Sequence, residues 1–146
     1  MKYFLILFLL LASPAFAQEV DVPIVSFSQQ VDIVVTAKKD PRILEVKFKQ
    51  EKDNILLDVV VDKSTELSQG KTLALNLIMY AKTKSLDDQP KEKNKPGKGL
   101  YNYTIAIAMP DGVKLVTATK EKAKEDLTFE DPFQVDPLTR EDADGR

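Results

Sequence analysis

Apolar and polar side chains alternate along most of the sequence after residue 30, and this period of two constrains the fold more than any other feature. Successive side chains of a β-strand point to opposite faces of a sheet, so alternation predicts strands with one buried face. The stretches 31–37, 55–61, 100–109 and 113–119 show this period, and 127–135 adds a shorter candidate limited by Pro132. The clearest case is 44–49, where Leu44, Val46 and Phe48 alternate with Glu45, Lys47 and Lys49.

Turn-forming residues separate these stretches. Residues 38–41 and 51–54 are polar breaks, and Pro110, Asp111 and Gly112 form a strong turn signal because proline presets φ and glycine accepts a positive φ. Six or seven short strands with turns between them are typical of an all-β, antiparallel two-sheet β-sandwich. The sequence predicts such a sandwich, immunoglobulin-like in its number of strands.

The stretch 72–82 fits two structures. Leu73, Leu75, Leu77 and Met79 alternate with other residues and therefore fit one face of a strand. Leucine, alanine and methionine also favour a helix. The regular alternation favours the strand, and a helix is the alternative.

The first seventeen residues have the pattern of a cleaved signal peptide. A lysine at position 2 precedes an apolar run over residues 4–11, and Ala15 and Ala17 flank Phe16 as a small-residue cleavage site. The run is too short for a spanning helix, which needs roughly twenty apolar residues. We therefore expect a periplasmic or secreted protein of a bacterial envelope, with no stable membrane insertion after cleavage.

These patterns divide the chain into four parts. Residues 1–17 are the predicted signal peptide, and residues 18–30 are a lead-in or edge strand, in which Pro23 lacks a donor for a central strand. The β-sandwich domain is expected over 31–135, and an acidic disordered tail over 136–146.

Residue types that the sequence lacks exclude several kinds of chemistry. The chain contains neither histidine nor cysteine, so it has no Ser-His-Asp triad, no Cys-His pair, no disulfide and no zinc site built on those ligands. A hydrolase that uses carboxylates remains a third possibility. The net charge is −2 and arginine occurs only at Arg42, Arg140 and Arg146, so we expect no nucleic-acid partner. No residue pattern indicates a cofactor, a metal or a catalytic residue.

Two sets of residues are candidates for binding. The loop 85–99 could contact an anionic surface through its lysines, although a solvated loop is the simpler interpretation. Tyr101 and Tyr103 share one face of a predicted strand and could stack on a ligand or fill the core. An acidic tail could also dock on a basic partner. The candidate binding residues are Lys91, Lys93, Lys95, Lys98, Tyr101 and Tyr103.

The sequence thus favours an exported, non-catalytic module that binds another envelope protein or a cell-surface component, by strand addition at an open sheet edge. The alternative is a carrier of a small ligand or lipid with a cavity between two sheets. Its predicted lining includes Leu75, Leu77, Ile105 and Ile107.

Overall fold

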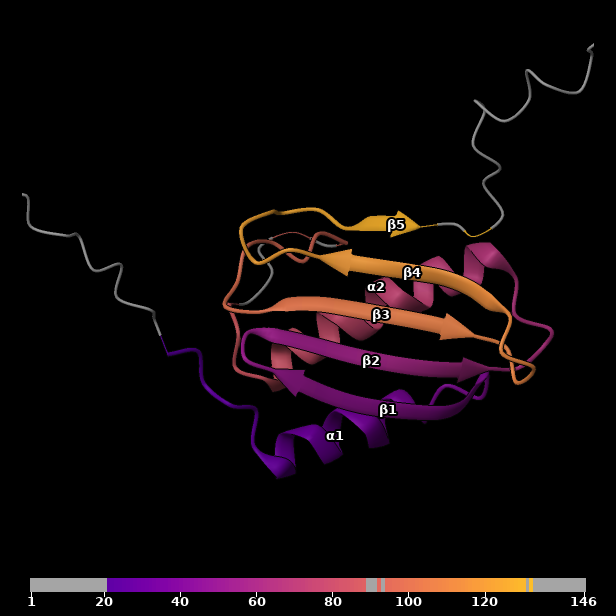
Figure 1. Cartoon of the computed structure of the whole chain (residues 1–146), viewed down its shortest axis with the longest axis horizontal. Coiled ribbons are helices and arrows are strands. Elements are labelled where there is room, and N and C mark those ends of the chain that lie inside the picture. The colour runs from indigo at the N-terminus through magenta and orange to yellow at the C-terminus, as the bar shows by residue number, and fades with distance from the viewer. Residues whose placement is uncertain (1–20, 89–91, 93, 131, 133–146) are drawn as a thin grey trace, which may run out of the picture.

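The computed structural model describes residues 21–88, 92, 94–130 and 132. This part of the chain forms one five-stranded mixed sheet with two helices packed against it (Figure 1). The predicted signal peptide and tail lie outside the described residues. The elements are α1 (Phe27–Ala37), β1 (Ile43–Glu51), β2 (Asn54–Val61), α2 (Leu67–Lys84), β3 (Asn102–Ala108), β4 (Lys114–Lys120) and β5 (Thr128–Glu130).

The strands lie in the sheet in the order in which they occur in the sequence. β1 and β2 form one antiparallel hairpin, and β3 and β4 form a second. β2 and β3 are parallel, and a parallel pair needs a crossover connection, which α2 supplies. From α1 to β4 the described chain therefore forms two successive α-β-β units joined in the middle of the sheet. The short β5 pairs with β4, so β1 and β5 are the two edge strands.

Helix α1 replaces the strand predicted over 31–37. A capping box starts the helix: Gln29 N donates to Ser26 Oγ at 3.3 Å, and Ser26 N donates to Gln29 Oε1 at 2.8 Å. Ile33 and Ala37, four residues apart, are its buried residues. The alternation in this stretch was misleading because apolar residues occupy more than half of the helix circumference.

Helix α2 replaces the strand predicted over 72–82, so the alternative interpretation was correct. Its buried residues have helical spacing, and its first turn has a capping box between Glu66 and Gln69. The stretch is apolar at nearly every position, so both periods fit it and local propensity favours the helix. The buried residues of α2 are Gly70, Leu73, Ala74, Leu77, Ile78, Ala81 and Lys82.

The predicted antiparallel two-sheet β-sandwich is wrong. One mixed sheet is present in the described part of the chain, and helices take the place of a second sheet. The cavity of the alternative carrier was expected between two sheets, and this fold provides no such space. Leu77, Ile105 and Ile107 are instead buried in the core between α2 and the sheet, and Leu75 is partly buried.

The two predicted hairpins are confirmed. β1 and β2 pair from Glu51↔Asn54 to Ile43↔Val61, and β3 and β4 flank the predicted turn at 110–112, where Gly112 has φ +86°. Alternate strand residues face the helices and form the core, as the period of two requires. The opposite face carries no helix among the described residues. None of the described helices has the length and apolar character needed to cross a bilayer.

Candidate functional site

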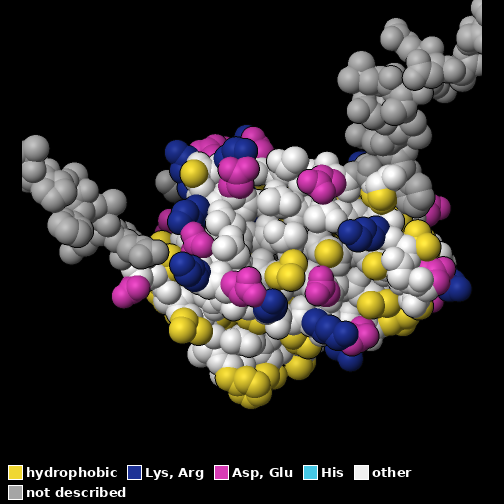
Figure 2. Space-filling model, viewed as in Figure 1, with side chains coloured by type: hydrophobic (Ala, Val, Ile, Leu, Met, Phe, Trp, Pro, Cys, Tyr) yellow, Lys and Arg dark blue, Asp and Glu magenta, His cyan; other side chains and the backbone are white. Residues whose placement is uncertain are grey.

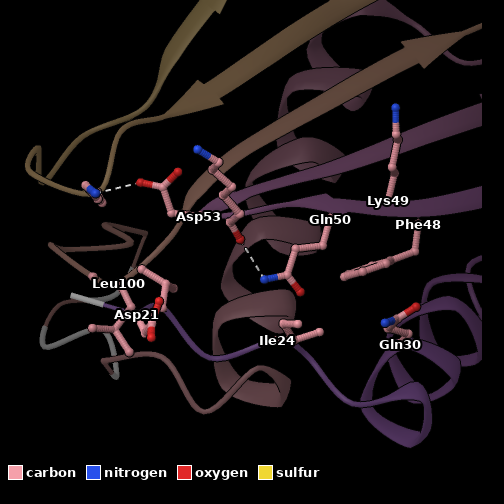
Figure 3. A pocket seen from close by; sticks show the side chains of 12 residues that line it. Asp21, Ile24, Gln30, Phe48, Lys49, Gln50, Asp53 and Leu100 are labelled. Atoms are coloured by element: carbon pink, nitrogen blue, oxygen red, sulfur yellow. Dashed lines mark hydrogen bonds and ion pairs between the residues drawn. The ribbon is translucent and has the colours of Figure 1, made fainter. Parts of the chain in front are cut away.

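A cleft of about 1180 Å³ opens between the lead-in at residues 21–24 and the end of the first hairpin (Figure 3). Phe48 and Ile24 give it apolar surface, and Figure 3 shows both among the side chains that line the cleft. The lining therefore combines four parts of the chain that are distant in sequence: residues 21–30, 48–53, 99–100 and 122. It consists of Asp21, Val22, Ile24, Gln30, Phe48, Lys49, Gln50, Lys52, Asp53, Gly99, Leu100 and Lys122.

Two side chains fix the lead-in against the sheet. The Gln50 amide accepts a hydrogen bond from Val25 N at 2.8 Å and donates to Pro23 O at 3.2 Å and to Lys52 O at 2.8 Å. The Tyr101 hydroxyl donates to Pro23 O at 2.7 Å. Gln50 and Tyr101 thus satisfy the backbone N–H of Val25 and the backbone C=O of Pro23. The lead-in is therefore held against the sheet and forms one wall of the cleft.

The charges around the cleft are mixed and largely paired. Lys122 Nζ lies 2.6 Å from Asp53 Oδ2, and this hydrogen bond holds the pKa of Asp53 below its usual value. Lys49 lies 2.6 Å from Glu51, and the hydrogen bond raises the pKa of Lys49 and lowers that of Glu51. Since the lining holds both aspartates and lysines, the cleft does not select a ligand of one charge.

An apolar stripe continues from the cleft along α1. Phe27 is 80% exposed and Val35 is 54% exposed, with Val31 between them at a spacing of four residues. Ile24, which is 83% exposed, extends the stripe into the cleft lining. Figure 2 shows apolar side chains along the lower edge of the molecule, where Figure 1 places α1. An apolar surface of this kind is typical of a binding site.

The stripe lies on the flank of α1 that is turned away from α2. The Tyr80 hydroxyl of α2 donates to Thr36 Oγ1 at 2.7 Å and thus contacts the other flank of α1. Figure 1 shows α1 alongside β1, which is an edge strand. An exposed apolar helix surface and a sheet edge therefore lie side by side.

The side chains of β1 on the open face have a symmetric charge pattern. Glu45, Lys47, Lys49 and Glu51 follow one another at every second position and are exposed. Each lysine pairs with the nearer glutamate of its own strand, Lys47 with Glu45 at 3.3 Å and Lys49 with Glu51 at 2.6 Å. Exposed pairs of this kind contribute little to stability, so these side chains can exchange partners at low cost.

A second polar cluster is buried at the end of α2. Lys82 Nζ lies 3.1 Å from Asp87 Oδ2, and both side chains are 0% exposed. Tyr103 donates to the same carboxylate at 2.9 Å, and Ser85 Oγ is 3.0 Å from the tyrosine hydroxyl. Burial raises the pKa of Tyr103 far above its usual value. The cluster ties the loop after α2 to the sheet.

Gly99 is required for this cluster. A Cβ at this position would overlap Lys82 Nζ and would lie 2.5 Å from Asp87 Oδ2. The backbone passes so close that Lys98 O accepts from Lys82 Nζ at 3.0 Å and Leu100 N donates to Asp87 Oδ1 at 2.6 Å. The chain therefore surrounds the charged groups on several sides.

Lys120 is a second fully buried lysine beside this cluster. Its ammonium group donates to Glu121 O at 2.6 Å. Burial, followed by repulsion from Lys82, lowers the pKa of Lys120. A lysine with a lowered pKa suits a catalytic base. Here the side chain is 0% exposed, so we assign the cluster a structural role.

The structure separates the sequence-predicted site residues. Lys91 and Lys93 lie outside the described residues. Lys95 is exposed and pairs with Glu92 at 3.1 Å, and the side chain of Lys98 is exposed. The described lysines of the loop thus belong to a solvated surface.

Tyr101 and Tyr103 are 1% and 0% exposed. Their rings contact each other edge to face, with centroids 6.1 Å apart. The two tyrosines fill the core and do not stack on a ligand at the surface, as the second of the two interpretations from the sequence predicted. Any effect of Tyr101 on binding is therefore indirect, through the lead-in that it holds.

Sequence reasoning missed the α1 stripe and the buried Lys82–Asp87 pair. The spacing of Phe27, Val31 and Val35 was a signal for the stripe, but it was hidden by the apparent alternation of the same segment. No sequence pattern indicated that Lys82 is buried. Lysine is almost never fully buried unless it is paired, and the sequence alone does not show that Asp87 is its partner.

The described residues contain no group of three or more acidic, histidine or cysteine side chains that could hold a metal ion. No protein-family model, curated protein or solved structure matches the chain.

Proposed function

We propose that this protein is an exported, non-catalytic interaction module that binds an extended segment of a partner along the edge of β1. The observation that carries the proposal is the position of the exposed α1 stripe beside this edge. An edge strand offers unpaired backbone donors and acceptors to a partner strand, and a neighbouring apolar surface adds buried area to that pairing.

The charges of β1 define the chemistry of the partner strand. Opposite charges on directly facing residues of two strands stabilise the pair, and like charges destabilise it. A partner strand therefore carries acidic side chains opposite Lys47 and Lys49, and basic side chains opposite Glu45 and Glu51. The absence of histidine and cysteine from the sequence supports binding over catalysis.

A binding experiment tests the edge. The probe is a synthetic peptide with the order Arg, Asp, Asp, Arg at alternate positions and threonine between them, and a peptide of scrambled order is the control. Hydrogen exchange of the full chain reports which amides become protected. We expect protection within residues 43–51 for the first peptide. Protection elsewhere only, or equal binding of the scrambled peptide, would contradict the proposal.

Matched variants separate the edge from overall charge. Lys47→Glu with Lys49→Glu reverses the two central charges of β1. Lys63→Glu with Lys114→Glu makes the same change in net charge at exposed positions outside β1. We expect only the first pair to weaken the peptide.

Export is tested separately. When the protein is expressed with its own leader in a bacterial host, we expect it in the periplasmic or secreted fraction with Gln18 as its first residue. An uncleaved protein in the cytoplasm would contradict the proposed export.

A further inference from the structure

The charge pattern of β1 disfavours pairing with the β1 strand of another copy. The order along the exposed face is Glu45, Lys47, Lys49, Glu51, which reads the same in both directions. Full antiparallel pairing of two such strands places Lys47 opposite Lys49 and Glu45 opposite Glu51. Facing like charges destabilise a strand pair, so the edge is protected against this self-association.

A partner strand for this edge needs the opposite charge at each position: base, acid, acid, base, at every second residue. The sequence contains this order once, as Arg140, Asp142, Asp144 and Arg146. Because both patterns are symmetric, all four facing pairs have opposite charge whether the strands run parallel or antiparallel. In either direction Ala143 faces Phe48, which places a small side chain on the side where α1 packs.

The position of β5 favours pairing between two copies. β5 lies at the opposite edge of the sheet, five strand spacings from a strand added beside β1, or about 24 Å. The eight residues from position 133 to Arg140 span at most about 26–29 Å when fully extended. A fully extended segment exceeds this separation by only about 2–5 Å and must also turn onto β1, so pairing within one copy requires a nearly straight path across the sheet.

We propose that residues 140–146 of one copy add as a strand to the β1 edge of a second copy. This inference rests on the proposed function and names its partner. The donor segment and the acceptor edge are different surfaces, so the contact is heterologous and produces head-to-tail oligomers unless a ring closes. Four exposed charge pairs make the association sensitive to salt.

Sedimentation of the full mature chain over a range of concentrations tests the proposal. We expect oligomers that grow with concentration at low salt and dissociate at high salt. Reversal of the donor acids (Asp142→Lys with Asp144→Lys) or of the acceptor bases (Lys47→Glu with Lys49→Glu) turns two attractive pairs into repulsive ones. Each reversal should weaken association by about ten-fold or more.

Combining the two reversals in one chain restores opposite charges and should restore association. Since all four positions are charged and the two acceptor lysines are exposed, the variants should keep the fold, which circular dichroism checks. A parent chain that stays monomeric, or a combined variant that is no better than the single reversals, would overturn the inference.

The outcome also separates this inference from the proposed function. If the chain is monomeric but the synthetic peptide still protects β1 amides, the edge binds a different partner and only the self-association is wrong. If neither the peptide nor a second copy protects β1, both proposals are wrong.

Discussion

Replacement of Lys82 by methionine should be the most damaging single change outside the apolar core. The ammonium group contacts the Asp87 carboxylate at 3.1 Å and Lys98 O at 3.0 Å, and it lies 6.0 Å from the centre of the Tyr103 ring. Methionine keeps most of the apolar stem and removes only the charge and its donors. The change therefore isolates the electrostatic contribution from the packing contribution.

The expected magnitude follows from complete burial. Removal of one partner of a buried ion pair typically lowers the free energy of unfolding by about 3–5 kcal/mol, because the remaining charge keeps its desolvation cost. Relief of the repulsion between Lys82 and Lys120 opposes this loss to a smaller extent. For a domain of this size the net loss corresponds to a fall in Tm on the order of 10–20 °C.

Urea unfolding followed by circular dichroism measures the loss, with two controls. Lys124→Met removes an exposed pair with Glu121 and should cost less than about 1 kcal/mol. Lys82→Met combined with Asp87→Asn removes both charges, keeps an oxygen that can accept from Leu100 N, and should recover much of the lost stability. If Lys82→Met lowered the free energy of unfolding no more than Lys124→Met does, the buried ion pair between Lys82 and Asp87 would be refuted.

Three further changes test the same region. Gly99→Ala should lower the free energy of unfolding by about 1–3 kcal/mol, because the added Cβ displaces the buried ion pair; urea unfolding that matches the parent would contradict the close approach. Tyr101→Phe should cost about 1 kcal/mol and accelerate proteolysis of the lead-in, since Pro23 O loses the shorter of its two hydrogen bonds and keeps only that from Gln50; unchanged cleavage would contradict this anchoring role. Burial lowers the pKa of folded Lys120, so between that pKa and the unfolded value the unfolded state binds more protons and stability rises with pH. Lys120→Met lacks this rise, so its gain in stability over the parent should be largest near neutral pH and shrink toward pH 10; a gain independent of pH would refute the burial argument.

The hairpins could be predicted from the sequence because local pattern and tertiary burial agree in them. Leu44, Val46 and Phe48 alternate with charged residues, and a polar turn follows at 52–53. The turn at Pro110 and Gly112 likewise has a local mechanism. Both hairpins are therefore determined within about twenty residues of sequence.

The helices could not be assigned in the same way. Segments 27–37 and 67–84 carry apolar residues on so many positions that a period of two and a period of 3.6 both fit. The capping boxes at Ser26 and Glu66 were the local signals that distinguish them. When 67–84 is not assigned as a helix, no crossover connection is available for a parallel pair such as β2 and β3. The sequence therefore predicted only antiparallel strands, and hence a β-sandwich.

The candidate site depends on tertiary placement even more strongly. The edge position of β1 and its proximity to α1 follow from the strand order, which the alternation of single strands does not encode. The order of charges on β1 is visible in the sequence. That these side chains lie on the open face of an edge strand, where they can contact a partner strand, is known only from the structure. The sequence predicts a disordered acidic tail, with docking on a basic partner as the alternative. The strand pairing that we propose assigns Lys47 and Lys49 of the β1 edge as that partner.

Hydrogen exchange of the β1 amides tests the central claim most directly. An edge strand has alternate amides without a partner in the sheet, so a fraction of the amides in residues 43–51 should exchange rapidly in the dilute full chain. These amides should become protected as the concentration rises or when the Arg-Asp-Asp-Arg peptide is added. Amides that are already protected in the dilute protein, or that stay unprotected when the peptide is bound, would contradict a strand-binding edge.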